Sequence, residues 1–112
     1  MEIVERVAGD VTILELKGKL ALGDGAEMLR NSVNTLTGQG RVKLVFQLEG
    51  VPFVDSAGLG EIVRTHTAAK RLSGALKLVK PTQRIVDLLT ITKVRNILEV
   101  FDSEDAALKS FA

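Results

Sequence analysis

The sequence of 112 residues contains no cysteine, tryptophan or tyrosine, and it has a single histidine. Without cysteine the chain forms no disulfide and no thiolate metal site, which fits a reducing compartment, and we expect a cytoplasmic location. With one histidine, a metal would depend on carboxylates, and these are scattered among predicted turns and helix starts. We therefore expect no metal and no cofactor.

The sequence also lacks an excess of charge of either sign and any long apolar run. Fifteen Lys and Arg residues against fourteen Asp and Glu residues give a net charge of +1, too little to hold a polyanion or an anionic membrane. The four phenylalanines offer few surfaces for stacking bases. No apolar run approaches the ~18 residues that span a bilayer. We expect neither nucleic-acid binding nor direct membrane insertion.

The first part of the chain changes from a strand pattern to a helix pattern. Short β-branched segments at 3–7 and 11–17 flank a Gly-Asp pair at 9–10, which predicts a β-hairpin. Asp24 and Glu27 resemble a capping box at a helix start. Apolar residues then recur at three- and four-residue steps, as on one helix face, at Ala26, Leu29, Val33 and Leu36.

The remainder alternates strands and helices in the same way. The predicted elements are a buried strand at 42–48, a helix at 57–72 capped by Asp55-Ser56, a strand at 76–79, a helix from Pro81-Thr82, a strand at 97–101 and a helix capped by Asp102-Ser103. The order ββαβαβαβα predicts an α/β fold: a mixed, mostly parallel sheet that begins with an antiparallel hairpin and is covered by about four helices. The length fits one domain over residues 1–112.

One segment, Phe-Val-Asp-Ser-Ala-Gly-Leu-Gly at 53–60, combines a helix start with unusual composition. Either Asp55 or Ser56 caps the helix. Each glycine in its first turns costs roughly 0.5–1 kcal/mol relative to alanine, which suggests a second role. Small residues leave a serine hydroxyl reachable by another protein, while Leu59 can anchor the turn. We take the candidate contact residues to be Asp55, Ser56, Ala57, Gly58, Leu59 and Gly60, with Ser56 as a site of modification.

A serine hydrolase is the enzymatic alternative for Ser56, and its chemistry requires a base. His66 is the only histidine, and ten helical residues at ~1.5 Å each place it ~15 Å along the axis from Ser56. The Gly-x-Ser-x-Gly pattern is absent because Val54 stands two positions before the serine. A dinucleotide fingerprint starting at Gly58 lacks its third glycine, since Val63 stands there. We expect no enzyme, and a hydrogen-bonded packing role for His66.

Phosphorylation of Ser56 would have a definite physical effect. A phosphoryl group adds about −1.5 to −2 charge, which free amides at a helix start can stabilise by about 0.3–1 kcal/mol. A partner surface that covered the serine would have to bury this charge without a counterpart, at a cost of several kcal/mol. The modification would therefore act on complex formation and leave the fold intact.

The 53–60 segment, preceded by the apolar strand at 42–48, resembles the signature of the STAS family, the bacterial anti-sigma factor antagonists. The resemblance extends over nearly the whole chain, through the opening strands, Gly18-Lys19-Leu20, the 76–79 strand and the 85–89 helix segment. It implies that Ser56 is the phosphoacceptor and that the unphosphorylated form binds an anti-sigma factor with serine kinase activity, which frees a sigma factor. It also implies a metal-dependent serine phosphatase that reverses the modification.

Two questions remain open at the level of sequence. Ala21 occupies a place where family members commonly carry Asp, and Asp24 either takes over that acidic, partner-contacting role or only caps the helix. The alternative function is that of a STAS-type binding or scaffold subunit without phosphorylation, in a transport, lipid-trafficking or stress-signalling complex. The oligomeric state is not determined by the sequence.

Overall fold

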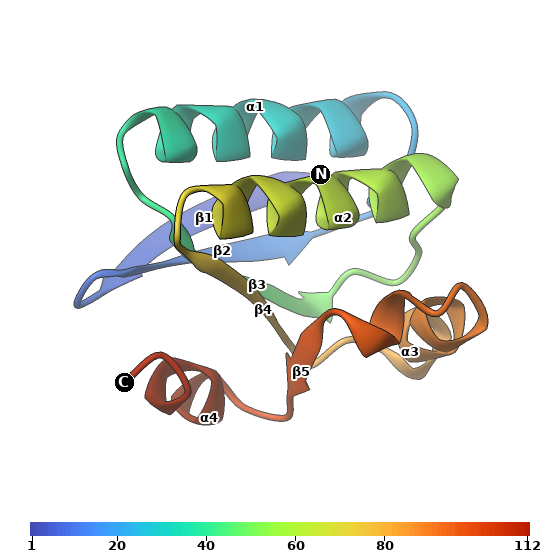
Figure 1. The fold of residues 1–112 in the computed structure, drawn as a ribbon. Coiled ribbons are helices and arrows are strands. Elements are labelled where there is room, and N and C mark those ends of the chain that lie inside the picture. The colour runs from blue at the N-terminus through green and yellow to red at the C-terminus, as the bar shows by residue number, and fades with distance from the viewer.

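A five-stranded β-sheet organises the chain (Figure 1), and the computed structural model describes residues 1–112. The elements in chain order are β1 (Glu2–Ala8), β2 (Val11–Lys17), α1 (Asp24–Gly38), β3 (Lys43–Gly50), α2 (Ser56–Arg71), β4 (Ala75–Val79), α3 (Gln83–Ile91), η1 (Val94–Asn96), β5 (Glu99–Phe101) and α4 (Glu104–Lys109). The predicted order ββαβαβαβα is confirmed, and η1 is a short 3₁₀-helix that the sequence pattern did not indicate.

The strands lie in the order β1-β2-β3-β4-β5, so neighbours in the sheet are also neighbours in sequence. β1 pairs antiparallel with β2, and the three other pairings are parallel. The hairpin turn has φ of 63° at Gly9, while Asp10 keeps a negative φ. This is the pattern of a type II′ turn, which requires glycine at its first central position. The mixed, mostly parallel sheet with its opening hairpin is confirmed.

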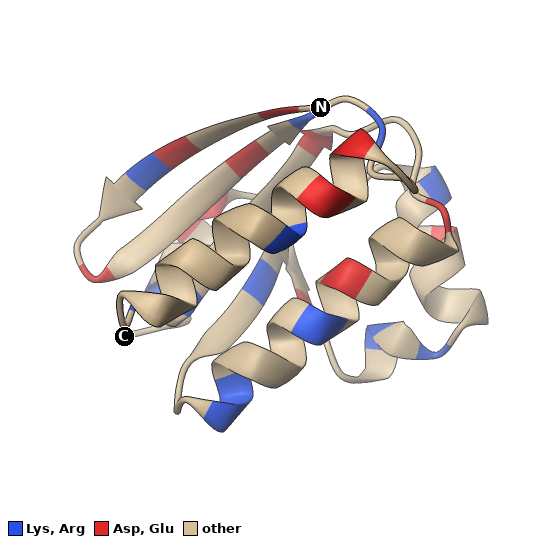
Figure 2. Ribbon diagram, turned by 90° about the horizontal axis from the view of Figure 1, so that it is seen from above, with Lys and Arg blue, Asp and Glu red and all other residues tan.

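Two long helices, α1 and α2, lie side by side over one face of the sheet (Figures 1 and 2). The strands alternate, so on β3 the side chains of Leu44, Phe46 and Leu48 point into this layer and are fully buried. α3 adds Ile85 and Leu89 to the same cluster of seventeen buried residues. This cluster is the main core.

The opposite face is covered only in part, by α4. Ala107 packs there in a second, smaller cluster that includes Val45 and Val79. Beside the start of α4 this face has a polar hollow of about 550 Å³ with no apolar lining residue. Arg6 on β1 donates two hydrogen bonds to Glu104 at the start of α4, at 3.0 and 2.7 Å. This ion pair ties the last helix to the first strand.

The boundaries differ from the sequence expectation at two places. No capping box forms at α1, because Gly23 is the N-cap and no side chain accepts a bond there; Asp24 is the first helical residue instead. The last strand begins at Glu99 and not at Ile97. Lys93 has φ of 64° and reverses the chain into η1, so Ile97 lies in the connection and is 52% exposed. None of the helices combines the length and apolar character needed to span a membrane.

Acidification tests the ion pair between α4 and β1. The Arg6 hydrogen bonds outweigh partial burial and hold the pKa of Glu104 below its usual value. The stabilisation is therefore complete above the unfolded-state pKa, about 4.3, and is lost as the pH falls through the lower folded-state value. We expect Glu104→Gln to lower the urea midpoint at neutral pH and to flatten its decline between about pH 5 and pH 3. Asp105→Asn is the matched control, because Asp105 is the exposed neighbour of Glu104 and lies outside the ion pair. If the urea midpoint of Glu104→Gln fell with pH as steeply as that of the wild type, the role given to the Arg6–Glu104 ion pair would be contradicted.

Candidate functional site

Ser56 stands at the start of α2, beyond the carboxyl end of β3. It is the first helical residue and is exposed, and the N-cap is Asp55 rather than the serine. The Asp55 Oδ1 atom accepts a hydrogen bond of 2.9 Å from the amide of Gly58. Capping by the aspartate leaves the neighbouring hydroxyl free of a structural task.

Asp55 also joins two loops. Its second carboxylate oxygen, Oδ2, accepts a hydrogen bond of 2.9 Å from the amide of Leu22, in the loop that precedes α1. The bonds from the Leu22 and Gly58 amides hold the pKa of Asp55 below its usual value. A carboxylate with both oxygens engaged in this way is a weak proton acceptor, so Asp55 is poorly suited to act as a base for Ser56.

Backbone contacts extend the connection between the two loops. The Leu20 amide donates to the Phe53 carbonyl at 3.0 Å, and the Asp55 amide donates to the Leu20 carbonyl at 3.3 Å. Leu20 and Val54 form a parallel β-bridge, and both side chains are buried. The loop before α1 is thereby fixed against the segment that enters α2.

The two glycines of the segment have different roles. A Cβ atom on Gly58 would lie 2.0 Å from the Leu20 carbonyl oxygen, so only glycine allows α2 to approach this loop. At Gly60 a Cβ would meet nothing within 4 Å. Gly58 is buried, which corrects its assignment to the exposed contact surface, whereas Gly60 is exposed.

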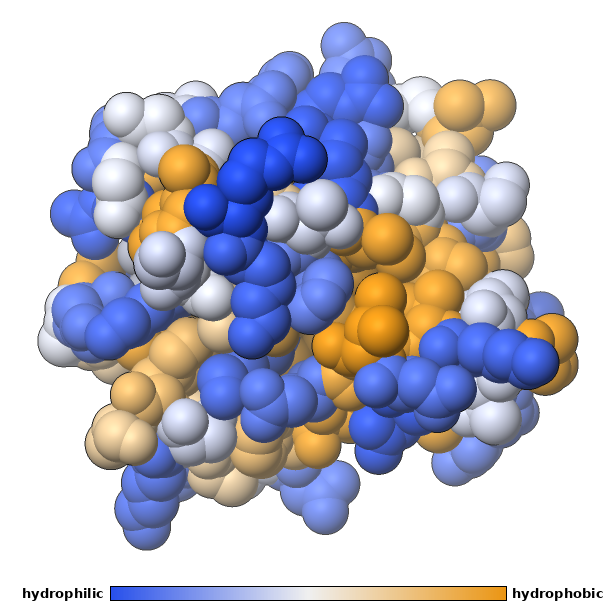
Figure 3. Space-filling view, in the orientation of Figure 1, coloured by the Kyte–Doolittle hydropathy of each residue, from blue (hydrophilic) through white to orange (hydrophobic).

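Exposed apolar side chains flank Ser56. Leu22 lies on the loop that Asp55 holds and is 82% exposed. A hollow of about 240 Å³ lies between Phe53 and Val54, which lead into α2, and α3. Ile91, which lines it, is 79% exposed. Figure 3 shows apolar side chains gathering between α2 and the α3–β5 segment. Single exposed apolar residues are common, but exposed apolar residues on both segments next to the α2 start indicate an interaction surface.

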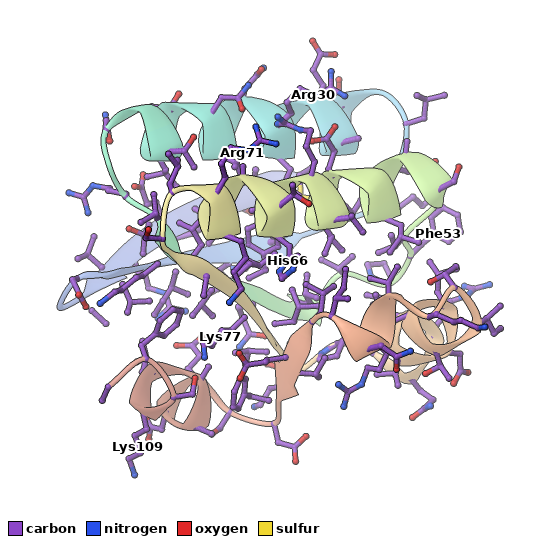
Figure 4. The ribbon with its side chains drawn as sticks, in the orientation of Figure 1. Arg30, Phe53, His66, Arg71, Lys77 and Lys109 are labelled. Carbon is purple, nitrogen blue, oxygen red and sulfur yellow. The ribbon has the colours of Figure 1, made fainter.

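The remaining residues of the segment fit such a surface in part. Ala57 is half-buried, and Leu59 packs against the main core as expected for an anchor. On the α3 side the Arg84 guanidinium lies 5.7 Å from the centre of the Phe53 ring, which points toward α3 in Figure 4. On its α3 side the surface near the α2 start is thus mostly apolar, with the Arg84 cation at its edge.

An ion cluster between α1 and α2 was not found by sequence reasoning. The side chain of Glu61 is 5% exposed, and its carboxylate accepts hydrogen bonds from Arg30 at 2.6 and 2.9 Å and from Arg64 at 3.0 Å. Burial disfavours the charged form of Glu61, but the two guanidinium groups outweigh it and hold its pKa below the usual value. The three-residue spacing of Glu61 and Arg64 on one helix could have predicted their ion pair. Nothing in the sequence indicated the contact with Arg30, which is thirty-one positions from Glu61.

Asp24 and Ala21 take different places in the loop before α1. The Ala21 carbonyl accepts the Ala26 amide at 2.9 Å, a backbone role that any residue could fill. Asp24 is exposed and its side chain caps nothing, so the capping interpretation is wrong. The structure leaves Asp24 as an exposed acid two residues after Leu22.

His66 does not approach Ser56, since both lie on the continuous helix α2, ten positions apart. The Nδ1 atom of His66 is buried without a hydrogen-bond partner, which corrects the expected hydrogen-bonded role. The side chain points away from the α2 start, below the helix (Figure 4). The Ser-His dyad is therefore excluded on geometry.

A mixed five-stranded sheet with an exposed serine at the start of its second long helix defines a small α/β domain. The STAS domain family model matches residues 2–107. The chain therefore belongs to the STAS domain family.

Three known proteins show this similarity in detail. The anti-sigma-B factor antagonist of Bacillus subtilis is 35% identical over 75 residues, which cover 67% of this chain and 68% of that protein. A Thermotoga maritima crystal structure superposes with a TM-score of 0.91 at 24% identity, covering 96% of this chain and 92% of the other. The Bacillus anti-sigma factor antagonist SpoIIAA has been solved unphosphorylated (TM-score 0.75, 20% identity, coverage 98% and 97%) and phosphorylated (0.78, 18%, 99% and 100%). At these identities the structural likeness establishes the fold.

The Asp55 connection can be tested by a matched pair of charge removals. Asp55→Ala removes the carboxylate that accepts hydrogen bonds from the Leu22 and Gly58 amides. Asp24→Ala removes the same charge from a side chain that makes no capping hydrogen bond. We expect a lower melting temperature for Asp55→Ala and faster amide hydrogen exchange at Leu22, with Asp24→Ala close to wild type. Equal effects of the two substitutions would show that the Asp55 hydrogen bonds do not hold the loop.

The two α2 glycines provide a second matched pair. Gly58→Ala forces a methyl group against the Leu20 carbonyl and should destabilise the protein by about 1–3 kcal/mol. Gly60→Ala meets open space and should stabilise the helix by about 0.5–1 kcal/mol. Chemical denaturation measures both. A neutral Gly58→Ala would mean that α2 can withdraw from the loop without loss.

Proposed function

We propose that this protein is an anti-sigma factor antagonist whose binding is switched by phosphorylation of Ser56. The observation that carries the proposal is the exposed Ser56 at a helix start, preceded by Phe53 and Val54, which line an apolar hollow against α3, and tied through Asp55 to the loop of the exposed Leu22. Membership of the STAS family and the similarity to the anti-sigma-B factor antagonist of Bacillus subtilis support the same assignment. The unphosphorylated chain binds an anti-sigma factor and so frees a sigma factor.

The apolar side chains around Ser56 supply the binding energy in this proposal. Leu22 and Ile91 lie in water in the free chain, and burying such side chains in a complex contributes roughly 1.5–3 kcal/mol each when burial is complete. Ala57, Leu59 and Gly60 border the serine, and Asp24 and Asp55 add acidic groups at the edge. A partner that covers this surface buries the serine hydroxyl near its centre.

Phosphorylation then opposes binding through charge. Asp55 already places a carboxylate at the α2 start. Its side chain accepts a hydrogen bond from the Gly58 amide, and its backbone carbonyl accepts one from the Leu59 amide. The expected supply of free amides for a phosphate is thus reduced. A phosphoryl group adds a charge of about −1.5 to −2 beside the Asp55 carboxylate, so the partner meets a local charge of about −2.5 to −3. Binding is lost while the fold is kept.

The chemistry of the switch belongs to other proteins in this proposal. The kinase is the anti-sigma factor itself, and a serine phosphatase restores the hydroxyl. The chain acts by binding and not as an enzyme, since Asp55 is a poor base and His66 is distant on α2. Both partners work in the cytoplasm, where sigma factors meet RNA polymerase.

The decisive experiment uses the purified anti-sigma factor kinase of the source organism with ATP. We expect one phosphate on Ser56 by mass spectrometry and none on Ser56→Ala. Ser73, an exposed serine just beyond the other end of α2, is the internal control. In a binding assay Ser56→Ala should retain affinity, and Ser56→Asp should lose at least about tenfold. Phosphate on Ser73 instead, or equal affinity of Ser56→Asp and wild type, would refute the switch.

A further inference from the structure

We propose that the surface at the C-terminal ends of α1 and α2 binds a second copy of this chain, through the acidic surface beside that copy's Ser56. The contact joins the copies head to tail, and it depends on charge. The first of these surfaces, which we name the basic end, is formed by exposed residues: Arg41, Lys70, Arg71 and Leu72.

The fold brings the cations of the basic end together from two segments. Arg41 follows α1, and Lys70 and Arg71 are the last residues of α2. The Ala75 amide donates a hydrogen bond of 2.9 Å to the Val42 carbonyl, so the residue next to Arg41 contacts the turn that follows α2. The two segments that carry the cations are thereby held side by side.

These cations have no counter-charge within the chain. None of the three forms an ion pair, and Lys43, two positions after Arg41, is already paired with Asp10 at 2.6 Å. The stretches 31–48 and 62–86, which contain the whole basic end, have no Asp or Glu. The basic end therefore holds three unpaired positive charges.

Helix dipoles do not account for this surface. A helix C-terminus carries a partial charge of about −0.5, so the two helices that end here offset about one of the three positive charges. The dipoles also give no reason for Leu72, which follows Arg71 and is 49% exposed. An exposed leucine beside unpaired cations is typical of a surface that another molecule covers.

The start of α1 and the loop before it have the complementary character. We name this surface the acidic end, and it is formed by Leu22, Asp24, Glu27 and Asp55. Leu22 is 82% exposed. Asp24 and Glu27 are exposed and form no ion pair, and the Asp55 carboxylate bonds only to backbone amides.

Few cations oppose the charge of the acidic end. Arg30 is held by Glu61 at 2.6 Å, and Lys19 is the one unpaired cation of the loop before α1. Each end thus presents an exposed leucine beside unpaired charges, and the charges of the two ends have opposite signs. The charge complementarity identifies a second copy as the molecule that fits the basic end.

One chain cannot bring its own two ends together. α1 and α2 run in the same direction, and Figure 2 shows acidic residues at the start of α1 and basic residues at the end of α2. Sixteen residues at ~1.5 Å each separate the two ends of α2 by about 24 Å. A second copy can place its acidic end on the basic end of the first. Because the two surfaces differ, the contact is heterologous and repeats into a chain of copies.

Self-association uses a surface that the proposed partner also needs. Asp55 directly precedes Ser56, so a copy bound at the acidic end covers the surroundings of the serine. Association therefore competes with the partner. The contact itself requires neither the partner nor phosphorylation.

Charge reversal at Arg71 tests the basic end on the purified protein. Arg71→Glu should weaken association at least about fivefold, measured at low salt by sedimentation velocity from micromolar to millimolar protein. Lys109→Glu is the matched control, because Lys109 is exposed and unpaired but lies on α4, at the opposite face of the sheet (Figure 4). It changes the net charge equally and should associate like the wild type. Equal weakening by both variants overturns the basic end, and thermal melts show that both fold.

A mixture of two variants tests the head-to-tail geometry. Asp24→Lys reverses a charge of the acidic end and by itself should associate as weakly as Arg71→Glu. Arg71→Glu keeps an intact acidic end, and Asp24→Lys keeps an intact basic end. An equimolar mixture should therefore recover the wild-type affinity in a one-to-one complex. A mixture that associates no better than either variant overturns the head-to-tail contact.

The wild-type protein gives two readouts that need no variant. Raising the salt concentration from about 0.05 M to 1 M shortens the Debye length to about 3 Å and should weaken association at least about tenfold. The amide NMR signals of Leu22 and Leu72 should shift together as the protein concentration rises, while that of Ile97 should not. A protein that stays monomeric at millimolar concentration and low salt overturns the proposal, as does association that salt does not weaken. None of these outcomes depends on phosphorylation of Ser56.

Discussion

The close approach of α2 to the loop before α1 is the constraint on which the rest of the site depends. Gly58 allows the contact because any Cβ there would collide with the Leu20 carbonyl. Asp55 then connects the two elements, because its carboxylate accepts hydrogen bonds from the amide of Gly58 in α2 and from the amide of Leu22 in the loop before α1. One glycine and one carboxylate thereby determine where Ser56 stands and which side chains surround it.

This construction separates stability from regulation. Asp55 makes the cap and the loop contact, Gly58 makes the packing contact, and Leu59 anchors the turn in the core. Ser56 takes part in none of these tasks, although it lies in the middle of the segment. A modification of its hydroxyl can therefore change what the surface binds without loosening the elements that form it.

Much of the fold was predictable from the sequence because its signals are local. The 42–48 apolar run, the three- and four-residue steps of α1 and the Gly9-Asp10 turn each depend on neighbouring residues, and the structure confirms the elements that they indicate. The errors occurred where local signals competed with longer contacts. Asp24 and Glu27 matched a capping box, yet Gly23 is the N-cap of α1. Lys93 reverses the chain into η1, and the strand expected from Ile97 begins only at Glu99.

The sequence by itself determined the element order, the absence of a nearby base on α2 and the position of Ser56 at a helix start, since these follow from periodicity and spacing along the chain. Only the tertiary structure decided that Gly58 is a packing residue, that Asp55 holds the Leu22 loop and that Glu61 binds Arg30. Each of these depends on residues far apart in sequence, whose proximity is set by how the helices settle on the sheet.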